Sequence, residues 1–144
     1  MKRLLLALLA MALSAAPAAA APPSDDEVLA RKTALDVAGA FSNDGFKLRD
    51  GHWLTTLQPG KSHVVQVHLF AGNEYWFSLG ATPRAKRIAV SVFDEKGQPL
   101  AYEPYVEGAT AAAGFAPEAS GPYLVKVAVL EGDPSAVCLL YSYK

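Results

Sequence analysis

The chain has 144 residues, 13 basic and 14 acidic side chains, and a formal net charge of −1. This balance provides no basic face for the phosphates of a nucleic acid. The length fits one domain. Hydrophobic residues make up 51% of the chain and are densest in its first twenty residues, so the sequence does not indicate a membrane-embedded protein.

Residues 1–20 have the pattern of a bacterial secretory signal peptide. Lys2 and Arg3 precede the apolar run Leu4–Leu13, and the small residues Ala18–Ala20 follow it. The run has half the length of roughly 20 residues that a membrane-spanning helix needs. Cleavage near Ala20 leaves 124 residues with 11 basic and 14 acidic side chains. We therefore expect a periplasmic or secreted protein that does not span the membrane.

Residues 21–49 are predicted to form one helix and a linker. Ser24 and Glu27 have the spacing of a capping box, and turn-forming residues 42–45 end the pattern. One apolar stripe recurs every three, four or seven residues and predicts a helix over about 25–41. The stripe consists of Val28, Leu35, Ala38 and Phe41.

From about residue 50 the apolar period changes to two, which is typical of half-buried strands. The clearest runs are 65–70, 74–79, 88–93, 123–130 and 136–143, with weaker ones at 53–57, 99–103 and 110–115. Turn-forming clusters separate them, and no helical pattern lies between them. We therefore predict that residues 50–144 form about eight antiparallel strands, arranged as a sandwich or a barrel. Cys138, the only cysteine, lies in the last apolar run, so we expect a buried, inert thiol and no intramolecular disulfide.

Several segments together have the order of a known family. They are Leu57–Gly60, the alternating run Val65–Leu69, Ala71-Gly72-Asn73-Glu74-Tyr75-Trp76-Phe77, Ile88–Gly97, and Phe115–Val127 with its Ser-Gly-x-Tyr centre. Over about residues 53–143 they resemble the bacterial pre-peptidase C-terminal (PPC) domain. The resemblance implies a jelly-roll-like β-sandwich without an active site of its own.

The resemblance also implies a class of function. PPC domains accompany exported peptidases and other exported enzymes, and some bind polysaccharide, protein fibres or calcium. This chain departs from them because it carries no catalytic domain. It also has Arg84-Ala85-Lys86-Arg87-Ile88 where many members have an acidic Asp-x-Asp strand, which argues against calcium binding.

Candidate catalytic and metal-binding residues do not form a recognisable site. His63 and His68 have opposite parity on one strand and should point to opposite faces, and His52 is separate. The acidic residues fit a helix start and turns, and Glu103 and Glu107 fall in a loop. The sequence has no nucleophile or phosphate-binding motif. We therefore predict no enzymatic activity, no metal and no cofactor; a small hydrolase using Glu103 or Glu107 is the less favoured alternative.

Aromatic side chains are the candidates for binding. Trp76 and Phe93 have outward parity on their strands, and Tyr102 and Tyr105 fall in a probable loop region. Such side chains can stack on a sugar ring or anchor a protein. The competing interpretation is that the helix packs over this outer face, since its apolar stripe needs a partner.

Together these features predict an exported, non-catalytic β-sandwich that acts as a binding or accessory module. Its partner would be either a polysaccharide or an envelope or secreted protein. The residues that contact this partner would be Trp76, Phe93, Tyr102 and Tyr105. The alternative is a structural, envelope-associated protein without a small-molecule ligand, whose helix covers the outer aromatic face.

Overall fold

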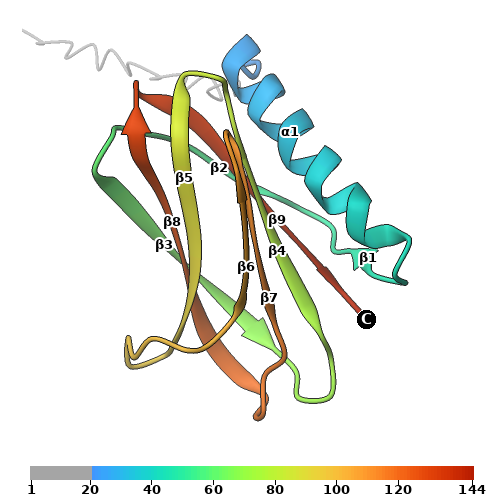
Figure 1. The fold of residues 1–144 in the computed structure, drawn as a ribbon. Helices are drawn as coiled ribbons and strands as arrows, with labels where there is room; N and C mark the ends of the chain where they lie inside the picture. Colours follow the sequence, from blue (N-terminus) through green and yellow to red (C-terminus); the bar gives the residue numbers. More distant parts are fainter. Residues whose placement is uncertain (1–20) are drawn as a thin grey trace, which may run out of the picture.

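A computed structural model describes residues 21–144, so the predicted signal peptide lies outside the described residues. One helix is followed by nine strands (Figure 1). The elements are α1 (Asp25–Ser42), β1 (Lys47–Leu48), β2 (Trp53–Leu57), β3 (Lys61–Leu69), β4 (Tyr75–Ala81), β5 (Ala85–Asp94), β6 (Glu103–Glu107), β7 (Thr110–Phe115), β8 (Gly121–Gly132) and β9 (Ser135–Tyr143).

The strands form two antiparallel sheets that face each other. Sheet A has the order β1-β9-β4-β7-β6, with β2 also paired to β9, and sheet B has the order β3-β8-β5. The predicted class, an all-β sandwich preceded by one helix, is confirmed, with nine strands rather than about eight. The strand expected at 99–103 lies instead at 103–107, because Pro99 makes only a single bridge to Phe93.

The alternating side chains fill the space between the sheets. Phe77 and Leu79 of β4 meet Val125 and Val127 of β8, and all four are fully buried. Because a strand directs successive side chains to opposite faces, each sheet contributes every second residue to this core. The prediction from period-two alternation is thus confirmed at residue level.

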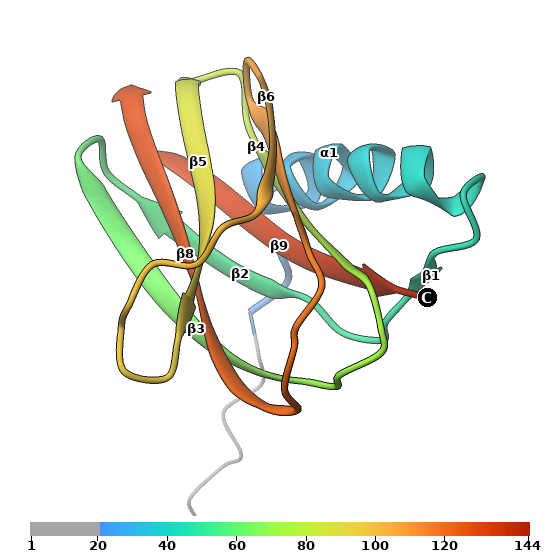
Figure 2. The same ribbon diagram turned by 60° about the horizontal axis from the view of Figure 1, so that its bottom comes forward.

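Helix α1 covers the outer face of sheet A, across β9 and β4 (Figures 1 and 2). Its Ser24 cap forms as predicted, with the side chain accepting from the backbone N–H of Glu27 at 3.2 Å. The predicted stripe is wrong at Val28 and Leu35, which are 54% and 37% exposed. The buried face consists of Ala30, Ala34 and Ala38, which pack on Ala136, Cys138 and Leu140 of β9.

Close approach of the two backbones explains this correction. A Cβ added to Gly80 of β4 would lie 2.6 Å from the Ala30 carbonyl oxygen and closer still to the Ala34 nitrogen. A helix that lies so near a strand has room only for alanine side chains at the contact. The larger side chains of Val28 and Leu35 therefore lie on the exposed faces of α1. The helix is therefore part of the sandwich, and β1, inside the predicted linker, already pairs with the end of β9.

Strands β2 and β3 are consecutive but belong to different sheets. A tight turn at residues 58–60 joins them, after which β2 pairs with β9 and β3 pairs with β8. The two strands therefore diverge from the turn and leave one side of the sandwich open between them (Figure 2).

Candidate functional site: a lateral groove between the sheets

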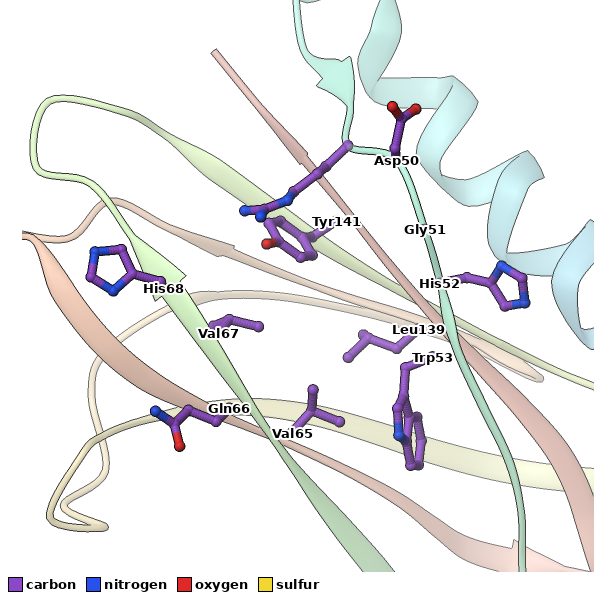
Figure 3. A pocket seen from close by; sticks show the side chains of 11 residues that line it. Asp50, Gly51, His52, Trp53, Val65, Gln66, Val67, His68, Leu139 and Tyr141 are labelled. Atoms are coloured by element: carbon purple, nitrogen blue, oxygen red, sulfur yellow. The ribbon is translucent and has the colours of Figure 1, made fainter.

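The open side between β2 and β3 contains a hollow of about 280 Å³ (Figure 3). One wall is the middle of β3 and the other is the segment from Arg49 to Trp53, with β9 as the floor. The lining residues are Arg49, Asp50, Gly51, His52, Trp53, Val65, Gln66, Val67, His68, Leu139 and Tyr141.

Trp53, the first residue of β2, lines the hollow on the side that faces the β2–β3 turn. Its indole stacks on the imidazole of His63, with ring centroids 4.5 Å apart and planes inclined by 23°. Beyond this pair, Val65 and Val67 point into the hollow, whereas Gln66 and His68 point away from it (Figure 3). The wall that β3 contributes is therefore apolar, with a polar rim.

Arg49 and Tyr141 form the polar centre of the floor. The Arg49 guanidinium lies 5.1 Å from the centre of the Tyr141 ring, and the Arg49 backbone N–H donates to the Tyr141 carbonyl at 3.0 Å. Burial raises the pKa of Tyr141, and the charge of Arg49 opposes that shift only in part. The pair thus presents a cation and a neutral phenol that can donate a hydrogen bond.

A second hollow, of about 350 Å³, adjoins the first and also contains Arg49 and Tyr141. Its other lining residues are Phe70, Asn73, Tyr75 and Tyr143. The Tyr75 hydroxyl accepts from the Phe70 backbone N–H at 2.9 Å and from the Asn73 amide at 3.2 Å, which holds the β3–β4 turn in place. We call the two hollows together the lateral groove.

The four aromatic residues proposed from the sequence do not lie together. Trp76 is half-buried on the outer face of sheet A, stacked on Phe41 of the helix with centroids 4.2 Å apart and planes inclined by 8°. Phe93 faces outward from sheet B, 6.0 Å from the Lys126 ammonium. Tyr102 packs against the main core.

Tyr105 is the most exposed of the four. It lies on β6, on the same outer face as Trp76, because it pairs with Ala112, which itself pairs with Ser78. Its hydroxyl donates to Glu107 at 2.7 Å, and this hydrogen bond is the main reason why the pKa of Tyr105 is raised. These positions divide the proposed contacts among two outer faces and the core.

The histidines follow the parity expected from the sequence. His63 packs on Trp53 on the inner side of β3, and His68 packs on Phe70, 5.0 Å between centroids, on the outer side. Within residues 21–144 there is no group of three or more His, Cys, Asp or Glu side chains that could hold a metal ion. The helix in this part of the chain is not long and apolar enough to cross a membrane.

Apart from His52 and His68, the residues of the lateral groove were not among the candidates from the sequence. Trp53 lies in a strand that the pattern predicts only weakly, and Arg49 is one of three charged residues, with Lys47 and Asp50, within residues 46–51. Both gain significance only because β2 and β3 separate into different sheets, which no local pattern encodes. The one signal in the sequence was that Trp53 is one of only two tryptophans and carries a large apolar surface.

Comparison of the sequence with models of known protein families and with curated proteins finds no match.

Proposed function

We propose that the protein is an exported, non-catalytic binding module, of the kind that PPC-like sandwiches represent, and that its ligand binds in the lateral groove. The observation that carries this proposal is the composition of the groove. Two adjoining hollows combine aromatic and aliphatic walls with a few polar groups, which is the usual make-up of a ligand site. Strands of both sheets hold the aromatic and aliphatic side chains of the first hollow, and the loop between β1 and β2 holds Arg49.

The groove is suited to a long, narrow ligand. It follows the open side of the sandwich from the Trp53–His63 stack, past Arg49 and Tyr141, to Phe70 and Tyr143. Phe70 is 51% exposed, so its ring is available for contact. A polysaccharide chain or a segment of an envelope or secreted protein fits this shape, and the groups present would hold either.

Single-tryptophan variants test the site. In Trp76→Phe only Trp53 reports, and in Trp53→Phe only Trp76 reports. We expect a ligand from a panel of soluble glucans, chitooligosaccharides, peptidoglycan fragments and extended peptides to change Trp53 emission and leave Trp76 emission unchanged. Arg49→Ala should weaken binding of that ligand. Arg84 is exposed and lines neither hollow, so Arg84→Ala should leave binding unchanged.

Two results would contradict the proposal. One is a ligand that changes only Trp76, which would move the site to the outer face of sheet A. The other is a folded protein in which nothing in the panel changes Trp53.

A second candidate is a structural, envelope-associated protein whose helix covers the aromatic face. The stacking of Phe41 on Trp76 favours it, because this contact hides the indole from solutes. Here Phe41→Ala would expose Trp76 and reduce stability, and the variant would still bind nothing in the lateral groove. Binding to the groove at wild-type affinity in Phe41→Ala separates the first candidate from the second.

A further inference from the structure

Strand β3 forms an unusual edge of the sandwich. Among the described residues it pairs with β8 alone, over all nine positions from Lys61 to Leu69 and without a break in register. The other side of β3 therefore presents a row of main-chain N–H and C=O groups without strand partners. A nine-residue edge of this kind is about 30 Å long.

The other edges are protected in ways that β3 is not. The pairing of β5 with β8 shifts register between Ala85 and Ile88. The C-terminal end of β5 is covered by the following segment, in which Pro99 forms a β-bridge with Phe93. β6 contains Pro104 between Glu103 and Tyr105. β1 has two residues and β2 has five. Proline, bulges and short length are the usual means of preventing strand addition, and β3 shows none of them.

The lateral groove lies directly beside this edge. Val65 and Val67 point from β3 into the first hollow, and a strand added next to β3 would direct every second side chain the same way (Figure 3). Those side chains would meet Trp53, Leu139 and Tyr141. An extended peptide could thus use the edge for main-chain hydrogen bonds and the groove for side-chain selection, as in other cases of strand addition.

The charges on this side favour an acidic peptide. β3 carries the cation Lys61 and no carboxylate. Arg49 lines both hollows of the groove, whereas the Asp50 side chain points away from it (Figure 3). Complementary charge supplies specificity and a faster encounter.

From these observations we infer that an extended, acidic segment of another protein adds to β3 as an extra strand and places alternate apolar side chains in the lateral groove. This inference rests on the proposed function, since it names the partner class for the same groove. A polysaccharide would use the groove without the main-chain edge, and a second copy of the chain would pair at the edge without any added peptide.

Hydrogen exchange with synthetic peptides tests the inference. The probes are nine-residue peptides, blocked at both ends, in which glutamate alternates with one apolar residue type: valine, isoleucine, leucine, tyrosine or phenylalanine. In the mature protein, we expect at least one probe to slow amide exchange in residues 61–69 by at least about tenfold at saturation. Exchange in residues 103–107 of β6 should not change.

Backbone methylation provides the matched control. N-methyl groups on alternate residues of the bound probe can be placed in either of two phases, which leave side chains and charge unchanged. The phase that faces β3 should weaken binding by at least about tenfold because several main-chain hydrogen bonds are lost together. The other phase should bind like the parent peptide. Equal effects of the two phases would overturn strand addition.

Charge reversal tests the acidic preference. Lys61 and His68 are both exposed. The double variant Lys61→Glu, His68→Glu should bind the glutamate probe more weakly than the wild type does. It should bind the same probe with lysine in place of glutamate more tightly. Lys86→Glu, exposed on β5, should do neither.

The remaining outcomes separate this inference from the proposed function. If a polysaccharide changes Trp53 emission while no peptide protects β3, the binding function stands and strand addition is wrong. If β3 becomes protected with rising protein concentration alone, and sedimentation shows a dimer, the occupant is a second copy and the inference is also wrong. If neither peptide nor glycan engages the groove, both proposals fail.

Discussion

The contact between Gly80 and the helix allows a sharp test of how α1 is attached to sheet A. In Gly80→Ala the new methyl group would lie 2.6 Å from the Ala30 carbonyl oxygen and 2.8 Å from the Ala34 Cα. Ordinary contacts begin at 3.4 Å. Both opposing atoms belong to backbone, so no side-chain rotation can relieve the overlap. The helix would have to move by roughly 1 Å, against a tightly packed interior.

Such overpacking typically costs about 1–3 kcal/mol. For a protein of this size the melting temperature should therefore fall by roughly 4–12 °C. Circular dichroism during heating and urea denaturation measures the loss. In the Trp53→Phe background, Trp76 emission should shift to longer wavelength, because displacement of the helix separates Phe41 from the indole.

Gly39→Ala is the matched control, since it makes the same chemical change within α1. Gly39 is exposed, and no atom of the surrounding structure lies within 4 Å of the place that the added methyl group would occupy. Replacement of a helical glycine by alanine should therefore stabilise the protein by about 0.5–1 kcal/mol. If Gly80→Ala keeps wild-type stability and native Trp76 emission, the helix is not seated on β4 as described.

Three further predictions concern buried polar groups. Ser135→Ala should destabilise by about 1–3 kcal/mol, because the Ser135 hydroxyl accepts from the Thr82 backbone N–H at 3.1 Å and lies 2.9 Å from the Thr82 hydroxyl. Ser78→Ala should be neutral or stabilising in the same urea assay, since the buried Ser78 hydroxyl has no partner among the described residues. Burial raises the pKa of Cys138 from 9.0 to about 11, so a thiol reagent at pH 8 should label it only after denaturation. Because the pKa of Cys138 is higher in the folded state than in the unfolded state, the thiol contributes its full share to the free energy of unfolding below pH 9 and loses it as the pH rises towards 11. Compared with Cys138→Ala, the wild-type protein should therefore lose more stability between pH 9 and pH 11. If the two proteins lose the same stability over this range, the thiol is not buried as described.

The layered fold could be predicted from the sequence because its determinants are local. Alternation along 88–93 and 123–130 corresponds to strands β5 and β8 with one buried face each, and Ser24 caps the helix as its spacing indicated. These patterns depend on the geometry of single strands and helix ends. They do not depend on which strand is next to which.

The helix face and the candidate site could not be predicted in the same way. The spacing of apolar residues predicted that Val28 and Leu35 are buried, but Gly80, far along the chain, decides that only alanines fit at the contact. Likewise, Trp53 and Tyr141 meet in one groove only because β2 joins β9 while β3 joins β8. Both are consequences of long-range pairing, which a pattern read within a short window does not contain.

The position of β9 in sheet A has a consequence for how the chain acquires its structure. This strand is the last in the sequence, yet it lies between β4 on one side and β1 with β2 on the other, and its outer face supports the helix. Within the described part of the chain, strands β1 and β2 therefore have no strand partner until β9 is in place, whereas the helix also packs on β4. Because β9 pairs with strands so distant in sequence, the closure of sheet A is expected to be a slow step of folding.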